Sequence, residues 1–144
     1  MITKTHHIGV NVTDMEAIIH FYGHILGLSM TGDTTMQGTF LDTVQGKSDM
    51  DYRIVKFSTP DGIFAEFLQD RGHETAPHPK TSLQAAGLRH FALETDDVDA
   101  FYQRIQSFGC ETVSAPCTSE DGSMRLFFVR DPEYNLVEIM QIYR

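Results

Sequence analysis

The chain has 144 residues, of which 41% are hydrophobic and 22% are charged, and its formal net charge is -9. This length and composition are typical of one globular domain, or of two small modules that share a core, and they argue against a disordered chain. The excess of negative charge argues against nucleic acid or an anionic membrane as a partner, since both attract concentrated positive charge.

The sequence also lacks the signals of a membrane or secreted protein. No apolar run approaches the roughly 20 residues that a membrane-spanning helix needs, and the first residues carry no signal-peptide core. We therefore expect a cytoplasmic protein with no membrane partner. Cys110 and Cys117 have no CxxC spacing, which favours reduced thiols.

Two segments of the first half recur in the second half. Residues 5–17 (THHIGVNVTDMEA) are matched 83 residues later by residues 88–100 (LRHFALETDDVDA). Residues 57–66 (FSTPDGIFAE) are matched 72 residues later by residues 129–138 (VRDPEYNLVE). These offsets align His7 with His90 and Glu66 with Glu138. The chain is therefore interpreted as a duplication, and the aligned residues are nominated as functional.

Each half begins with a strand and then a helix. Apolar and polar residues alternate in residues 7–12 and again in 90–95, which predicts half-buried strands. Thr13 is the predicted cap of the first helix, with Glu16 completing a capping box, and Asp96 is the predicted cap of the second. Gly27 and Gly109 end the helices. The apolar stripes consist of Met15, Ile18, Ile19, Tyr22 and Leu26, and of Val98, Phe101, Ile105 and Phe108.

Further strands are predicted after each helix. They span residues 52–58 and 63–68 in the first half, and 124–129 and 135–142 in the second, and proline-containing turns at 59–62 and 131–134 join them. Residues 31–51 are interpreted as one strand plus a loop that could cover a site. The chain is thus predicted to be an α+β protein made of two tandem βαβββ modules. Its single structural domain comprises a first module (1–70), a linker (71–86) and a second module (87–144).

The alternation of side chains along the strands bears on function. His7 and His90 lie on the strand face opposite the apolar side chains that meet the helices. Glu66 and Glu138 lie within apolar strands, where a carboxylate is costly unless a cation compensates it. The four residues His7, Glu66, His90 and Glu138 are therefore predicted to bind one divalent metal ion. The remaining histidines are interpreted as surface residues, because they have no counterpart in the other half or, in the case of His6, the wrong strand parity.

These motifs resemble the vicinal oxygen chelate superfamily, which includes glyoxalase I, methylmalonyl-CoA epimerase, extradiol dioxygenases, and fosfomycin and bleomycin resistance proteins. The resemblance rests on residues 7–14 (HIGVNVTD), 87–97 (GLRHFALETDD) and 131–138 (DPEYNLVE), and it covers nearly the whole chain. It implies a glyoxalase-like fold of curved mixed sheets around a metal-binding cleft. It also implies that His7, Glu66, His90 and Glu138 are the ligands and that the protein is a homodimer.

A site of two imidazoles and two carboxylates suits Ni, Zn, Co, Mn or Fe in the divalent state. Such an ion could stabilise an enediolate or enolate while a proton leaves the carbon next to a carbonyl. Glu138, and after it Glu66, are the candidate general bases. The sequence thus predicts a metal-dependent lyase or isomerase with a small-molecule substrate. Two alternatives remain: Fe(II)-dependent cleavage of catechol-like compounds through His7, His90 and Glu138, and a non-catalytic small-molecule binding or resistance protein.

Overall fold

The computed structural model describes residues 1–80 and 83–144. The chain divides into two compact units, Met1–Pro77 and His78–Arg144. The predicted linker, residues 71–86, includes residues 81 and 82, which lie outside the described part. Within the described residues, no helix is long and apolar enough to cross a membrane.

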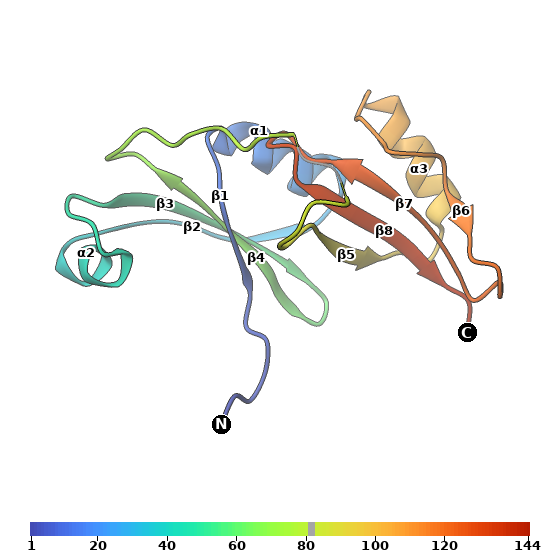
Figure 1. Cartoon of the computed structure of the whole chain (residues 1–144), viewed down its shortest axis with the longest axis horizontal. Helices are drawn as coiled ribbons and strands as arrows, with labels where there is room; N and C mark the ends of the chain where they lie inside the picture. The colour runs from blue at the N-terminus through green and yellow to red at the C-terminus, as the bar shows by residue number, and fades with distance from the viewer. Residues whose placement is uncertain (81–82) are drawn as a thin grey trace. The chain divides into compact units, whose positions relative to one another are not determined.

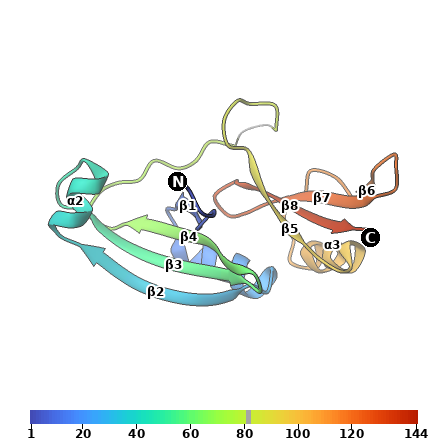
Figure 2. The ribbon, with the colours of Figure 1, turned by 90° about the horizontal axis from the view of Figure 1, so that it is seen from below.

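The first unit is a curved sheet of four strands with helical segments (Figures 1 and 2). The strands lie in the order β1-β4-β3-β2, in which β1 is parallel to β4 and the other neighbours are antiparallel. In chain order the elements are β1 (Ile8–Asn11), α1 (Met15–Ile19), η1 (His20–Ile25), β2 (Ser29–Gln37), α2 (Thr39–Gln45), β3 (Asp51–Thr59) and β4 (Gly62–Asp70).

The second unit repeats this topology with the strand order β5-β8-β7-β6, and β5 is parallel to β8. Its elements are β5 (His90–Glu94), α3 (Val98–Ser107), β6 (Cys117–Thr118), β7 (Met124–Arg130) and β8 (Leu136–Ile142). Each unit contains a strand, a helix and three further strands. The predicted α+β class and the predicted βαβββ order are therefore confirmed.

Both first helices are capped by an aspartate one residue later than predicted. The Asp14 carboxylate accepts a hydrogen bond from the Ala17 amide at 3.0 Å, and the Asp97 carboxylate accepts one from the Ala100 amide at 2.9 Å. The predicted caps Thr13 and Asp96 are therefore wrong. An aspartate accepts the same orphan amide bond as a threonine and also places negative charge at the positive end of the helix.

The apolar stripes also differ from the prediction. After α1 the helix continues as the π-helical segment η1, in which the Leu26 amide donates to the Phe21 carbonyl at 2.8 Å. This wider turn shifts the helical register. Phe21 is buried, whereas Ile19 is only half-buried. In the second unit Val98 and Ile105 are fully buried as predicted, but Phe108 follows the end of α3 and is exposed.

The segment predicted as one strand plus a loop contains a second helix. Residues 29–37 form β2, and residues 39–45 form α2 rather than a loop. Leu41 of α2 packs in a buried cluster with Met50, Tyr52 and Ile54. Burial, reinforced by the negative charge of Asp70, raises the pKa of Tyr52. Helix α2 therefore covers the Tyr52 end of one sheet face.

The opposite face of the first sheet carries the main core of that unit. Tyr22 of η1 is fully buried, and its ring centroid lies 4.4 Å from that of Phe67 and 5.9 Å from that of Phe57. On β3, therefore, Phe57 and Val55 face the helix, while Lys56 between them faces the other way. The two faces of this sheet differ: one is covered by α1 and η1, and the other carries the apolar cluster under α2 at its Tyr52 end and polar side chains around Lys56.

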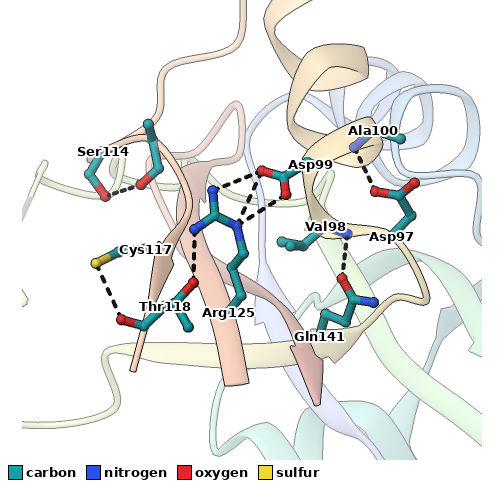
Figure 3. Close-up of polar contacts among 10 residues, drawn as sticks. Asp97, Val98, Asp99, Ala100, Ser114, Cys117, Thr118, Arg125 and Gln141 are labelled. Carbon is teal, nitrogen blue, oxygen red and sulfur yellow. Dashed lines mark hydrogen bonds and ion pairs between the residues drawn. The ribbon is translucent and has the colours of Figure 1, made fainter. Parts of the chain in front are cut away.

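In the second unit an arginine joins three elements (Figure 3). Arg125 of β7 donates to Asp99 of α3 at 2.9 Å and to Thr118 of β6 at 3.0 Å. On the same helix, the Val98 amide donates to the Gln141 side chain of β8 at 3.2 Å. These contacts fix the start of α3 against the ends of β7 and β8.

The turn between β7 and β8 depends on the buried Asp131, which is only 2% exposed. Its carboxylate accepts hydrogen bonds from the Glu133 and Asn135 amides, each at 2.9 Å, and from the Asn135 side chain at 3.0 Å. Asp131→Ala leaves these donors unsatisfied, and we expect it to lower the free energy of unfolding by about 2–3 kcal/mol. Urea denaturation checks this expectation, with the exposed Asp96→Ala as the control. Equal stability of the two variants would contradict it.

An ion pair in the first unit predicts a pH effect. Arg53 of β3 donates two hydrogen bonds to Asp33 of β2, at 3.0 and 2.7 Å, and these lower the pKa of Asp33 below its ordinary 3.8. A carboxyl whose pKa is lower in the folded state stabilises the fold above pH 3.8 and loses that contribution as the pH falls through the folded-state pKa. Asp33→Asn should therefore lower the melting temperature at pH 7, and the difference from the wild type should shrink towards pH 2. A pH-independent difference would contradict this.

Candidate functional site

The first unit brings together two of the four predicted metal ligands. His7 precedes β1, and Glu66 lies in the middle of β4, opposite Gly9 in the parallel pairing. The Nε2 atom of His7 is 3.5 Å from Oε2 of Glu66. The carboxylate side chain is only 14% exposed, while the imidazole is 35% exposed. A nearly buried carboxylate thus lies beneath an accessible imidazole nitrogen.

The second unit brings together the other two. His90 begins β5, and Glu138 of β8 is paired with Ala92. The Nε2 atom of His90 is 3.1 Å from Oε2 of Glu138, whose side chain is 12% exposed. The predicted side-chain parity is confirmed for this strand, because Phe91 and Leu93 point inward and are half-buried while His90 is exposed.

The two pairs have the same construction. Each glutamate is opposite a small residue, Gly9 or Ala92, and each histidine lies two residues before that small residue. Residues two apart on a strand share a face, so the imidazole lies diagonally above the carboxylate. Strand pairing, rather than a local motif, therefore assembles each His-Glu pair.

A group of three or more His, Cys, Asp or Glu side chains suited to holding a metal ion is not found within residues 1–80 and 83–144. Each unit offers one imidazole nitrogen and one carboxylate, which is half of a typical ligand set. That the two pairs bind the same ion remains a prediction.

Sequence reasoning missed Lys56, which completes the polar cluster in the first unit. Its Nζ atom is 3.0 Å from Oε1 of Glu66, while Oε2 of the same carboxylate faces His7. The hairpin turn at 59–62 would by itself place Lys56 opposite Ala65. A β-bulge after Phe57 shifts the pairing by one residue and places Lys56 opposite Glu66 instead. Such a bulge leaves no clear signal in the sequence.

The second unit has an aromatic ring at the equivalent place. Phe128 of β7 is paired with Glu138, as Lys56 is paired with Glu66. The Phe128 ring packs edge-on against the His90 imidazole, with 5.2 Å between centroids and an interplanar angle of 79°. The two carboxylates are alike in position and burial, but one has an ammonium group beside it and the other a phenyl ring.

His6 is a second residue that the sequence interpretation set aside. Its Nδ1 atom is 2.7 Å from Nδ1 of His7. The parity argument did not apply to it, because β1 begins only at Ile8. A hydrogen bond between these nitrogens fixes the orientation of the His7 ring and leaves Nε2 turned towards Glu66. A hydrogen bond to the second ring nitrogen is a common way to orient a histidine in a metal site, although the partner there is usually a carboxylate, a backbone carbonyl or water.

His20 and His24 lie on the helical side of the first sheet, away from His7 and Glu66. Their rings stack with 5.0 Å between centroids. They line an open groove of about 550 Å³ together with Glu16, Ile19, Gly23, Met30 and Phe57. Because Phe57 and Lys56 are adjacent on β3, they point to opposite faces of the sheet. The groove is therefore separate from the His7–Glu66 pair.

The family model of the Glyoxalase/Bleomycin resistance protein/Dioxygenase superfamily matches residues 4–139. This chain therefore belongs to that superfamily, which confirms the resemblance that the sequence motifs indicated.

Several individual proteins are also similar to this chain. The uncharacterized protein YaeR of Escherichia coli (strain K12) is 28% identical over 135 residues, which cover 90% of this chain and 89% of YaeR. The uncharacterized protein YwkD of Bacillus subtilis (strain 168) is 26% identical, with 98% of each chain covered. A glyoxalase family protein from Bacillus cereus has a similar fold, with a TM-score of 0.88 and 21% identity over 100% of this chain and 97% of its own. A glyoxalase/dioxygenase from Nostoc punctiforme has a TM-score of 0.65 and 26% identity, covering 98% of this chain and 92% of its own.

Proposed function

We propose that this protein is a divalent-metal-dependent lyase or isomerase that removes a proton next to a carbonyl group of a small molecule. The observation that carries the proposal is the repeated pair of an accessible imidazole over a nearly buried carboxylate, with contacts of 3.5 and 3.1 Å. Burial of an anion is costly without a compensating cation. Glu66 has the Lys56 ammonium beside it, whereas the cross-strand neighbour of Glu138 is the uncharged Phe128. The membership of the superfamily supports the same function.

The donor atoms fit a first-row divalent ion. Two imidazole nitrogens from His7 and His90, with carboxylate oxygens from Glu66 and Glu138, form a mixed nitrogen and oxygen set that suits Ni, Zn, Co, Mn or Fe. Four protein ligands leave coordination positions for substrate oxygens. The pairs lie on different units, so a complete site needs the other pair of the same chain or that of a second copy. We propose a cytoplasmic homodimer.

When bound, the ion supplies Lewis-acid stabilisation of the negative charge that develops as a proton leaves carbon. The residues of the chain have separate roles around it. His7 and His90 would hold the ion through their Nε2 atoms. Glu138, which has an aromatic neighbour, accepts the substrate proton, and Glu66 is the alternative acceptor. The buried strands behind both carboxylates limit access of water from the core side.

A second function is favoured by one observation. Since Lys56 already neutralises Glu66 at 3.0 Å, the remaining ligands His7, His90 and Glu138 make up two histidines and one carboxylate. This set is characteristic of non-haem Fe(II) oxygenases. The alternative proposal is therefore Fe(II)-dependent ring cleavage of a catechol-like compound, for which Glu66 is dispensable.

Metal binding is the first test. In calorimetric titrations of chelator-stripped protein, Ni²⁺ or Co²⁺ should bind. His90→Ala removes a ligand nitrogen and Glu138→Gln removes the negative charge of a ligand, and each should weaken binding roughly 100-fold, the upper end of the loss that follows removal of an outer-shell partner. The control His20→Ala, on the opposite sheet face, should bind as the wild type does. Binding that all three variants retain would contradict the assigned ligands, and no binding by the wild type would favour a non-catalytic binding protein. The molar ratio, measured with the native mass, tests the homodimer.

Activity is the second test. A panel of 2-oxoaldehyde hemithioacetals, acyl-CoA epimers and catechols, assayed with oxygen and without it, separates the two chemistries, since proton transfer consumes no oxygen. We expect turnover of a carbonyl substrate without oxygen uptake, with kcat reduced about 10²–10⁴-fold in Glu138→Gln. Full activity in both Glu138→Gln and Glu66→Gln would rule out proton abstraction by these carboxylates. Oxygen uptake with a catechol, retained in Glu66→Gln, would support the oxygenase.

A further inference from the structure

The duplicated His-Glu pairs differ at one register position, and this difference concerns charge. Lys56 and Phe128 occupy equivalent places on β3 and β7, each directly opposite the glutamate of its unit. The Lys56 ammonium binds Oε1 of Glu66. Among the described residues, the ion pair of Glu138 is with His90, and its cross-strand neighbour is an uncharged ring.

The place of Lys56 is prepared by the fold. Gly32 of β2 is its cross-strand partner on the other side. A Cβ at Gly32 would lie 3.4 Å from Cδ and 3.5 Å from Cγ of Lys56, in close contact with the lysine stem. The aliphatic part of the lysine thus lies over a residue without a side chain, and its charged end reaches Glu66. The lysine is 35% exposed, so its ammonium can move away into solvent.

We propose that Lys56 is an internal counter-cation for Glu66, which a divalent metal ion must displace, so that the two His-Glu pairs bind metal with unequal affinity. The inference rests on the proposed metal function. One carboxylate cannot fully serve an ammonium group and a dication within a few ångströms, because the two cations repel each other. His90 and Glu138 therefore form the stronger half of the site, and Lys56 makes Glu66 the replaceable ligand. In this scheme Lys56 does not touch the metal ion, and it acts only through its effect on the Glu66 carboxylate.

Two substitutions test this proposal by reversing the charge difference between the pairs: one removes the ammonium group beside Glu66, and the other adds one beside Glu138. Lys56→Met removes the ammonium but keeps an unbranched apolar stem, and it should tighten Co²⁺ binding about tenfold. Phe128→Lys introduces an ammonium beside Glu138, and it should weaken Co²⁺ binding about tenfold. Lys47→Met, at an exposed position after α2, makes the same change of net charge as Lys56→Met. Because Lys47 has no part in either pair, this control should alter the affinity less than about twofold. Calorimetry of the full chain with Co²⁺ alone gives these affinities.

A second measurement needs no metal. In chelator, Lys56→Met leaves the nearly buried Glu66 without its ammonium partner, and the melting temperature should fall by about 2 °C. The same substitution in a Glu66→Gln background should leave the melting temperature unchanged, because no charge remains to compensate. At saturating Co²⁺ the order should reverse, because tenfold tighter binding stabilises Lys56→Met by about 1.4 kcal/mol relative to the wild type, which exceeds the loss seen in chelator.

The outcomes separate this inference from the function on which it rests. A wild-type chain that binds no Co²⁺ overturns the metal function and the displacement together. Co²⁺ binding that Lys56→Met leaves unchanged or weakens overturns only the displacement, and the metal function stands. An equal loss of melting temperature from Lys56→Met with and without Glu66 also overturns the role of Lys56 as its counter-cation.

Discussion

Both halves of the chain bury a carboxylate on the polar face of a sheet, and this constraint determines the arrangement of their neighbours. Glu66 and Glu138 are 14% and 12% exposed, each in the middle of a strand whose other side belongs to an apolar core. A charge in such a place needs hydrogen bonds or a cation. Each glutamate is accordingly met by a histidine from the neighbouring parallel strand.

Parallel strand pairing explains why both units contain a His-Glu pair although their sequences differ. A parallel pair places the first strand of a unit beside its last, so residues far apart in the chain share one face. Gly9 and Ala92 are the residues opposite the glutamates, and both are small. The charge beside the glutamate differs on the third strand, with Lys56 in one unit and Phe128 in the other. The two units thus share the same strand pairing around the glutamate and differ in the charge beside it.

Much of this arrangement was accessible from the sequence, because it depends on periodicity. The alternation around His90 predicted the face on which that histidine lies, and the two proline turns predicted the hairpins that carry Glu66 and Glu138. The duplication strengthened both predictions, since each half served as a check on the other.

The remaining features depend on shifts of one residue, which periodicity does not reveal. The helix caps are Asp14 and Asp97 because neighbouring polar residues compete equally well for the same amide. The π-helical segment after α1 and the β-bulge that brings Lys56 to Glu66 each insert an irregularity into a regular pattern. Helix α2 was missed because its seven residues contain two threonines and end at a glycine, a composition that also suits a loop.

Anomalous diffraction from crystals of the Co²⁺-loaded protein tests the central claim most directly. The account predicts an anomalous peak at about 2.0–2.2 Å from Nε2 of both His7 and His90 and from an oxygen of Glu138, with Glu66 at the same ion if Lys56 has moved aside. A peak bound elsewhere, for example between His20 and His24, with both His-Glu pairs unchanged, would contradict it.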